Sequence, residues 1–326
     1  MASFIKQVQN FAFQNNLWER DSRIIIGVSG GPDSACLLHV MNILAKKNNF
    51  ILHIAHVNYD LRGKDSEKDE IFVKKLGEKY GIEVSVLRPK KIEYPPVGGG
   101  NLENCLRDIR YSFFEKLRKD LNFDLIAVAH NQNDQAETVL MKIIRGTGLS
   151  GMRAMKAKNY FLIRPLLGTS RKDILAYLKE NRLKYRIDKT NSENVFTRNK
   201  TRNSLIPYIE KNFNSSLVQN LANLSNIVAD DYEIIAEQAE KFAGIVCKNK
   251  CAQFSVKEFI LFPCSIQRQV LRTLIIRIKE NEHSGLGINQ VEEILKIVNS
   301  AKDKSQKALI GGLKISKKGD TVEIFC

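Results

Sequence analysis

The stretch that decides the fold reads RIIIGVSGGPDSACLLHV and runs from Arg23 to Val40. Its first residues are apolar and predict a buried strand, and a helical pattern begins at Ser34. Between them lies a turn of small and polar residues, SGGPDS (29–34). Such a turn between a strand and a helix N-terminus directs several backbone N–H groups at one place, where the helix dipole adds positive potential. The stretch therefore predicts a phosphate site.

The side chains of this turn fit a phosphate ligand. Gly30 and Gly31 lack a Cβ, so a ligand can approach the backbone closely, and Pro32 completes the turn. Ser29 and Ser34 carry hydroxyl groups that can donate hydrogen bonds.

Asp33 is the acidic residue of the turn and would repel a bare phosphate. Its presence therefore indicates a Mg²⁺ ion shared with the phosphates. Two common phosphate loops are excluded, because the turn contains neither GxxxxGK[ST] nor GxGxxG.

Strand and helix patterns alternate along the first two hundred residues. Apolar strands are predicted at 23–29, 50–59, 83–89 and 124–130, and amphipathic helices at 34–47, 65–81, 101–121 and 133–146. This alternation predicts an α/β fold with a doubly wound parallel sheet. Ligands bind such sheets beyond the carboxyl ends of the strands, which brings Ser29, His56 and His130 together. The Pro- and Gly-rich segment 91–101 is expected to be a mobile loop over this edge.

The pattern changes after NFNSS (212–216). Long helices are predicted at 220–244, 265–280 and 289–300, followed by a terminal strand pair within 307–326 whose turns are GG and KKGD. We therefore predict two domains, 1–212 and a smaller, mainly helical domain, 213–326, that ends in short strands.

The composition indicates a soluble protein of the cytoplasm. The 326 residues are 43% hydrophobic with a mean hydropathy of −0.26, and the apolar runs are too short to span a membrane. The N-terminus lacks the features of a signal peptide. The six cysteines form no CxxC pair, which favours small buried apolar residues over a metal site.

The net charge of +15 indicates a polyanionic partner. From Lys142 to Lys211 there are 17 Lys and Arg residues against five Asp and Glu, an excess of 12 positive charges. The alternative interpretation of this basic segment is a solvated surface that keeps the protein soluble.

The turn resembles the pyrophosphate loop, SGGxDS, of the ATP pyrophosphatase superfamily. Further stretches resemble blocks of the tRNA(Ile)-lysidine synthase family, in that family's order and over about residues 20–212; they are HVNYDLRGKDSEKDEIFV, NCLRDIRYSFF, AHNQNDQAETVLMKIIRGTGLSGM, IRPLL and DKTNSENVFTRNKTRNSLIP. The later helices and strands are similar to its first carboxy-terminal domain, and we do not identify the further domain of larger members.

The resemblance implies a reaction and its partners. ATP with Mg²⁺ adenylates the 2-carbonyl oxygen of the wobble cytidine in an isoleucine tRNA with a CAU anticodon, and the ε-amine of free L-lysine then displaces AMP. It also implies adenylation in 1–212, tRNA recognition in 213–326, Asp33 at the metal, adenine near His56, and a homodimer.

Asp134 and Glu137 lie three residues apart on one face of a predicted helix. Two carboxylates at this place can hold an ammonium group and help to deprotonate it. The alternative is that acidic residues offset the helix dipole, which is common. The matching family block favours the first interpretation.

Arg107 and Arg110 share a helical face, and a guanidinium suits a phosphate or an adenylate, with Arg110 the stronger candidate. Surface salt bridges are the alternative. His130 either contacts the nucleotide or orients an acid, and a purely structural histidine is the alternative.

Arg198, Lys200 and Arg202 lie on an apparent helix that follows the basic segment. They are candidates for contacts with the phosphates of an anticodon stem, and the resemblance places Arg202 near the reacting base. A solvated helix face is the alternative.

Three other functions remain open at this point. A cytidine thiolase with the same loop typically uses CxxC pairs or an iron–sulfur cluster. An NAD synthetase would not need the basic segment. A non-catalytic RNA-binding relative would not need to retain Asp33, Asp134 and Glu137.

Overall fold

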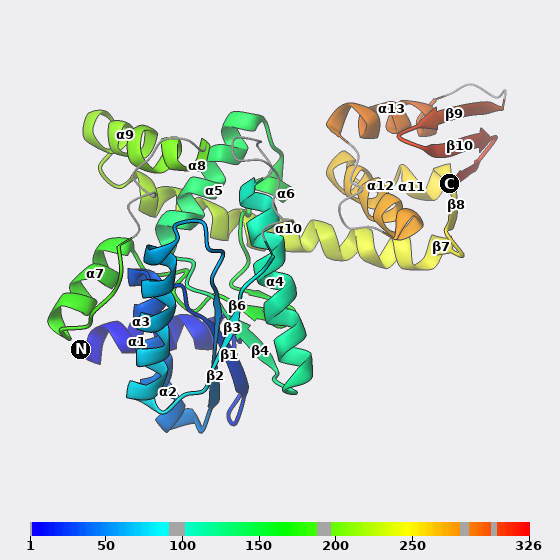
Figure 1. Ribbon diagram of the computed structural model, residues 1–326. Helices are drawn as coiled ribbons and strands as arrows, with labels where there is room; N and C mark the ends of the chain where they lie inside the picture. Colours follow the sequence, from blue (N-terminus) through cyan, green and yellow to red (C-terminus); the bar gives the residue numbers. More distant parts are fainter. Residues whose placement is uncertain (1, 91–101, 188–196, 281–286, 301–304) are drawn as a thin grey trace. The chain divides into compact units, whose positions relative to one another are not determined.

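The computed structural model describes residues 2–90, 102–187, 197–280, 287–300 and 305–326, which form two compact units, Met1–Asn226 and Ile227–Cys326 (Figure 1). The division between the units falls within helix α10 (Leu217–Val246). The domain boundary expected at 212/213 lies in the turn before that helix and stays a prediction. The loop expected at 91–101 lies outside the described residues.

The first unit contains a six-stranded sheet of order β3-β2-β1-β4-β6-β5. Its strands are β1 (Arg23–Gly27), β2 (Ile51–Val57), β3 (Val84–Leu87), β4 (Leu125–Ala127), β5 (Lys158–Asn159) and β6 (Leu162–Ile163). All neighbours are parallel except β5 and β6, which are antiparallel. The predicted α/β fold is confirmed, with an antiparallel edge strand added, because two residues between β5 and β6 allow only a hairpin.

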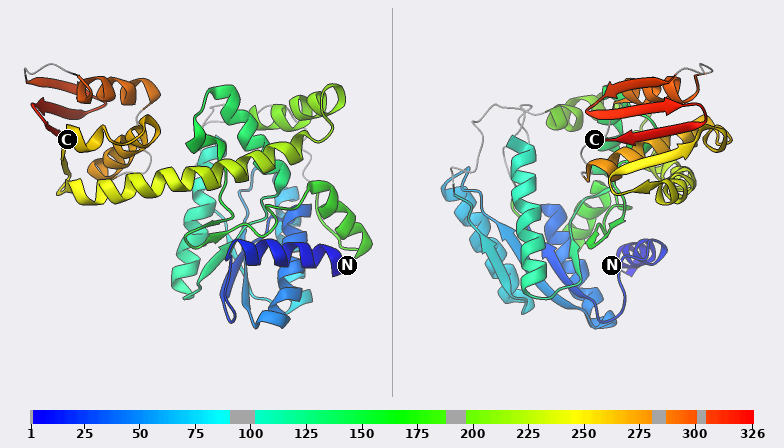
Figure 2. Two further views of the ribbon diagram at one scale, coloured as in Figure 1. Left: turned by 180° about the vertical axis from the view of Figure 1, so that it is seen from behind. Right: turned by 90° about the vertical axis from the view of Figure 1, so that its right-hand side faces the viewer.

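Helices cover both faces of this sheet (Figure 2). The helical elements of the first unit are α1 (Ala2–Gln14), α2 (Pro32–Asn48), α3 (Lys64–Tyr80), α4 (Leu102–Asp120), α5 (Gln132–Arg145), α6 (Leu149–Met152), α7 (Arg171–Glu180), α8 (Thr197–Lys200), a π-helical turn η3 (Thr201–Leu205), α9 (Ile206–Asn212) and the first part of α10. Helix α1 was not predicted; its Phe4 stacks on Tyr177 of α7 with ring centroids 4.3 Å apart.

Strand β1 shows why the sheet needs two helical layers. Ile24 and Ile26 belong to the core shared with α2, whereas Ile25 belongs to the core around Phe114 of α4. All three isoleucines are fully buried, and burial of such a side chain contributes about 1.5–3 kcal/mol. The continuous apolar run of β1 is therefore the pattern of a strand covered on both faces.

The strand order reverses between β1 and β4, because the chain passes from β1 outward to β2 and β3 and returns to β4 on the other side. Ligands of doubly wound sheets bind at such a reversal, beyond the carboxyl ends of the strands. The turn 29–34 follows β1 and Asn131 lies shortly after β4. This edge of the sheet positions the site.

The second unit is built on a five-stranded antiparallel sheet, β7-β8-β11-β10-β9. Its elements are β7 (Cys247–Lys248), β8 (Cys251–Ser255), α11 (Val256–Phe259), α12 (Cys264–Lys279), α13 (Ile288–Val298), β9 (Gln306–Ile310), β10 (Leu313–Lys318) and β11 (Thr321–Phe325). The tail forms three strands, β9, β10 and β11, where a pair was expected. Strand β8, which precedes the tail, pairs with β11 on its other side. Gly311, Gly312 and Gly319 take positive φ at the predicted turns.

No helix within the described ranges is both long and apolar enough to cross a membrane. All six cysteines are described and free of disulfides. The interpretation of the cysteines as buried apolar residues holds for Cys36 only, because Cys264 and Cys326 are exposed and the other three are half-buried.

Candidate active site

The turn 29–34 is held in shape by its own polar groups. Ser34 Oγ accepts from the Ser29 amide at 3.2 Å and donates to the Gly31 carbonyl at 3.0 Å. Ser34 is buried, so it shapes the turn, whereas Ser29 is exposed and can face a ligand. Gly30 has φ +90°, a conformation that L side chains rarely adopt. Gly31 precedes Pro32, the first residue of α2.

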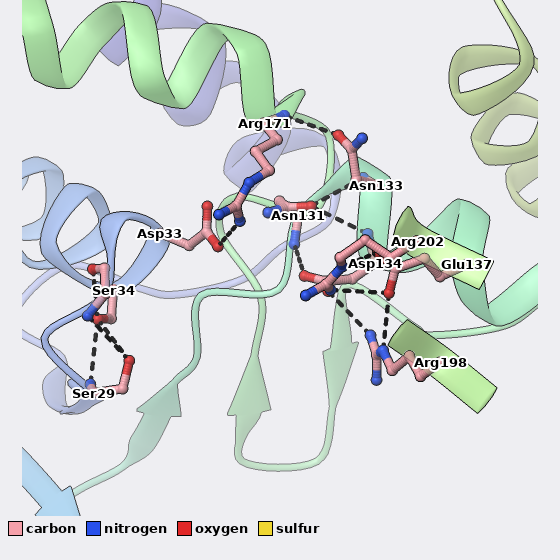
Figure 3. A network of polar contacts seen from close by, with 11 residues as sticks. Ser29, Asp33, Ser34, Asn131, Asn133, Asp134, Glu137, Arg171, Arg198 and Arg202 are labelled. Atoms are coloured by element: carbon pink, nitrogen blue, oxygen red, sulfur yellow. Dashed lines mark hydrogen bonds and ion pairs between the residues drawn. The ribbon is translucent and has the colours of Figure 1, made fainter. Parts of the chain in front are cut away.

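Asp33 lies in the first turn of α2 and pairs with Arg171, the first residue of α7 (Figure 3). Arg171 Nη1 lies 2.6 Å from Asp33 Oδ2. The other carboxylate oxygen, Oδ1, is buried and has no hydrogen-bond partner in the described part of the chain. Burial raises the pKa of Asp33 above its usual value, although Arg171 opposes this effect.

The N-terminus of α5 is closed by a reciprocal cap. Asn131 Oδ1 accepts from the amides of Asn133 and Asp134, and Asp134 Oδ2 accepts from the amide of Asn131 at 3.0 Å. Asp134 therefore caps the helix, a role that differs from the dipole compensation given as the alternative interpretation. Its second carboxylate oxygen, Oδ1, takes no part in this cap and accepts from side chains.

Two arginines from beyond residue 196 meet Asp134 and Glu137 (Figure 3). Asp134 Oδ1 accepts from Arg198 Nη2 at 3.0 Å and from Arg202 Nη2 at 2.9 Å. Glu137 accepts from Arg198 Nε at 2.9 Å and from Arg202 Nε at 2.5 Å. We call Asp33, Asp134, Glu137, Arg171, Arg198 and Arg202 the ion-pair cluster; its three carboxylates face three guanidiniums.

The burial of this cluster controls its electrostatics. The Glu137 side chain is 1% exposed. Burial alone would raise the pKa of Asp134, but the positive charges of Arg198 and Arg202 outweigh it and the pKa is lowered. Removing one partner from a buried ion pair costs about 3–5 kcal/mol, so the cluster holds these four side chains in place.

Arg202 lies in the π-helical turn η3 between α8 and α9. Backbone torsions stay in the right-handed helical region at Lys200 and Ile206, so the three segments continue one another. Such turns inside helices occur frequently at functional sites. Here the wider turn carries Arg202 to the same two carboxylates that Arg198 contacts. Lys200 is exposed and is not part of the cluster.

A cavity of about 600 Å³ lies beside the cluster and is strongly basic. Its lining contains eight Lys or Arg residues and no described Asp or Glu. Those residues are Arg107 and Arg110 of α4, Lys142 and Arg145 of α5, Arg153 and Lys156 after α6, together with Arg164 and Arg198. We call this the basic cavity. Arg198 belongs to both the cavity and the ion-pair cluster.

The two arginines of α4 contact aromatic rings, whereas surface salt bridges were the alternative to the predicted phosphate or adenylate contacts. The Arg107 guanidinium lies 5.1 Å from the centre of the Tyr111 ring. Arg110 is exposed, and its Nε donates to the Tyr59 hydroxyl at 3.2 Å. Neither side chain reaches the ion-pair cluster in the contacts of the described residues, but both line the basic cavity.

His130 and His56 are both held in the neutral form by burial, which lowers the pKa of each ring. His130 lines the basic cavity, and its Nδ1 accepts from Arg164 Nε at 3.2 Å. His56 Nδ1 donates to the Val28 carbonyl at 2.8 Å, and its Nε2 is buried with no partner among the described residues. His56 thus links the end of β2 to Val28, the residue before the turn 29–34.

Sequence reasoning missed three arginines of this region. Arg171 and Arg164 belong to the basic segment 142–211 but were not singled out within it, although Arg164 falls within the quoted block IRPLL. The third is Arg186, whose amide donates to the Gly30 carbonyl at 2.9 Å and whose Nε donates to Asp69 at 2.8 Å. Each depends on a contact with a residue far away in the sequence, which no local spacing reveals.

Comparison with known proteins places these observations in a family. The PP-loop domain family matches residues 2–209. The tRNA(Ile)-lysidine synthase of Clostridioides difficile is 35% identical over 313 residues, which cover 95% of this chain and 68% of that protein. The chain belongs to the tRNA(Ile)-lysidine synthase family.

Other members of the family give the same picture. The enzyme of Clostridium tetani is 38% identical, covering 89% of this chain and 62% of its own length, and that of Caldanaerobacter subterraneus is 36% identical, covering 90% and 63%. The chain therefore spans about two thirds of the length of these tRNA(Ile)-lysidine synthases.

A solved structure with the same fold is the U34-tRNA thiolase from Methanococcus maripaludis. It has a TM-score of 0.53 and 21% identity, over 68% of this chain and 79% of that one. At this identity the likeness concerns the fold alone. The match of residues 2–209 to the PP-loop domain family supports ATP binding by this chain.

Proposed function

We propose that this protein forms lysidine, by the ATP-dependent ligation of lysine to the wobble cytidine of an isoleucine tRNA with a CAU anticodon. One observation carries the proposal beyond family membership: Arg171, which pairs with Asp33 of the turn 29–34, donates its amide to Asn133 Oδ1 at 2.9 Å at the start of α5, the helix of the buried carboxylates Asp134 and Glu137. A site for a triphosphate and a site for an ammonium group therefore lie at one edge of the sheet.

The first half-reaction requires a leaving diphosphate. The 2-carbonyl oxygen of cytidine attacks the α-phosphorus of ATP, the bond between the α- and β-phosphates breaks, and diphosphate departs. The backbone amides of the turn and the N-terminus of α2 are placed to stabilise the charge that develops on the diphosphate.

Asp33 fits a Mg²⁺ ion that accompanies ATP. Its buried, unpartnered Oδ1 is a carboxylate oxygen, and Mg²⁺ in nucleotide sites uses one or two carboxylates plus phosphate oxygens. The ion would offset the negative charge of the phosphates. Within the described residues no group of three or more His, Cys, Asp or Glu side chains could hold a metal, so Asp33 would act together with the substrate.

The second half-reaction requires a deprotonated amine. The ε-amine of lysine attacks C2 of the adenylated cytidine, the bond from C2 to the adenylated oxygen breaks, and AMP departs. Asp134 and Glu137 are placed to bind the ammonium form and accept its proton. Because guanidiniums occupy both carboxylates, lysine must take the place of one of them. Arg198 is the one to move, since it also lines the basic cavity.

The decisive test incubates the protein with ATP, labelled lysine and an isoleucine tRNA transcript, followed by nucleoside analysis. We expect labelled lysidine, equimolar AMP, and no product without lysine. Glu137→Gln should abolish product, whereas the control Glu115→Gln, which removes an exposed carboxylate of α4, should not. AMP formation without a lysine adduct would refute the assignment.

A further inference from the structure

Arg164 is a buried cation, and no anionic partner for it lies among the residues that the structure describes. It follows β6 directly and is 5% exposed. Its Nε donates to His130 Nδ1 at 3.2 Å and its Nη1 donates to the Lys156 carbonyl at 2.7 Å, with a further hydrogen bond to Tyr111. All these acceptors are neutral, and no carboxylate pairs with Arg164 in the part of the chain that the structure describes.

An unpaired buried charge is costly, because it loses its hydration without gaining a counter-charge. The arginines of the ion-pair cluster avoid that cost by facing carboxylates. Around Arg164 the opposite holds, because the eight basic residues of the cavity have no acidic residue among them. The repulsion extends to Lys142, whose pKa is lowered by burial and by Arg153 and Arg145. An anionic ligand in the cavity would supply Arg164 with a counter-charge.

The position of the cavity indicates which anion. Its lining comes from α4, α5, the segments around β5 and β6, and Arg198 of α8, and contains no residue of the turn 29–34. The phosphates of ATP have their own site at that turn. A volume of about 600 Å³ is in the range of sites that enclose a ligand of nucleotide size. The wobble nucleotide must enter the site with the phosphodiester groups that flank it.

We propose that the basic cavity holds a phosphodiester group of the RNA beside the reacting nucleotide, and that Arg164 is the buried residue that anchors it. This inference rests on the proposed function and names the subsite through which the RNA is held. A guanidinium whose Nε and Nη1 are already fixed by the protein can offer its remaining N–H groups to phosphate oxygens in a defined direction.

Arg164 also positions His130. Because Arg164 donates to Nδ1, the neutral ring carries its proton on Nε2. His130 lines the same cavity and therefore presents a neutral N–H donor to the ligand. The anchor and the donor are thus coupled through one hydrogen bond.

The test compares two variants that each remove one positive charge. Arg164→Gln changes the proposed anchor, and Arg182→Gln changes an exposed arginine outside the cavity. The probe is the unmodified anticodon stem-loop RNA with the CAU sequence, and its Kd is measured by fluorescence anisotropy at several salt concentrations. ATP binding is measured on the same preparations.

We expect Arg164→Gln to weaken RNA binding about tenfold, as the loss of a charge-assisted hydrogen bond implies. It should also lower the salt slope by about 0.7–0.9. ATP binding should be unchanged, and Arg182→Gln should bind RNA like the wild type. Equal losses in the two variants, or a loss of ATP binding with unchanged RNA binding, would overturn the proposal.

A folding defect in Arg164→Gln is covered by a second variant. Arg164→Lys keeps the charge but loses the guanidinium fork, so weakened RNA binding supports the anchor and unchanged binding overturns it. The lysidine assay separates this proposal from the proposed function. Lysidine formation by the wild type together with normal RNA binding by the variants refutes the anchor alone. The expected RNA-binding pattern without lysidine formation refutes the function alone.

Discussion

The ion-pair cluster and the basic cavity share Arg198 but have opposite charge arrangements. In the cluster three carboxylates face three guanidiniums at hydrogen-bond distance. The lining of the cavity contains eight Lys or Arg residues and no described Asp or Glu, and among the eight Arg198 pairs with the two carboxylates of the cluster. This difference supports the proposal that the two regions serve ligands of opposite charge. In that proposal the cluster keeps its carboxylates paired until an ammonium group arrives, whereas an anion in the cavity gives Arg164 a counter-charge.

The largest effect is expected at Asp33, which has one unpartnered oxygen. Asp33→Ala should reduce AMP formation by about a hundredfold or more, because the charge of the leaving diphosphate loses its stabilisation. Binding of the stem-loop RNA should stay intact, since the basic cavity does not include Asp33. AMP is measured by chromatography with tRNA and lysine present. Normal turnover would contradict the role of the turn.

Glu137 tests whether the pairing in the cluster supports the fold. Glu137→Ala leaves Arg198 and Arg202 without their buried partner and should lower the free energy of unfolding by about 3 kcal/mol. The matched control is Glu115→Ala, whose exposed pair with Lys119 should contribute less than about 1 kcal/mol. Urea titrations measure both. Similar losses in the two variants would show that the cluster is not a structural centre.

The raised pKa of Asp33 also predicts how the stability of the fold depends on pH. Burial raises the pKa of its carboxyl in the folded state, so ionisation costs stability as the pH rises above the unfolded value near 3.8. Asp33→Asn should therefore raise the Tm at pH 7, and the gain should vanish near pH 3. Differential scanning calorimetry at both pH values measures this. A lower Tm at pH 7 would mean that the Arg171 pair outweighs the burial.

The smallest effect concerns the histidines. Burial lowers the pKa of His39, His53, His56 and His130 below 6.5. The unfolded chain then binds protons first, so stability should fall as the pH drops through 6.5. His130→Gln should reduce this slope by up to about 1.4 kcal/mol per pH unit. Urea unfolding at pH 7.5 and 5.5 measures the slope, and an unchanged slope would contradict a neutral His130.

Local patterns were enough to predict strands β1 to β4, but not β5 and β6, and the edge of the sheet at which the turn 29–34 and the start of α5 lie. The apolar run before Ser29 and the small residues after it predict the strand, the turn and the helix, and the spacing of Asp134 and Glu137 predicts their shared face. The partners of these carboxylates could not be predicted, because Arg198 and Arg202 were candidates for RNA contacts and the ion pairs join residues more than 60 positions apart. Arg164 lies in the block IRPLL, but its burial without a described acid beside it could not be predicted from local sequence.

The π-helical turn at Thr201–Leu205 has a consequence for the comparison of related sequences. A turn of this type accommodates one residue more than a regular α-helix does. A relative that lacks the extra residue would have its second arginine at a different spacing from the first while both still reach the carboxylates. Alignments that treat 197–212 as regular helix will then pair Arg202 with the wrong column, and an apparent loss of this arginine will be a shift in register.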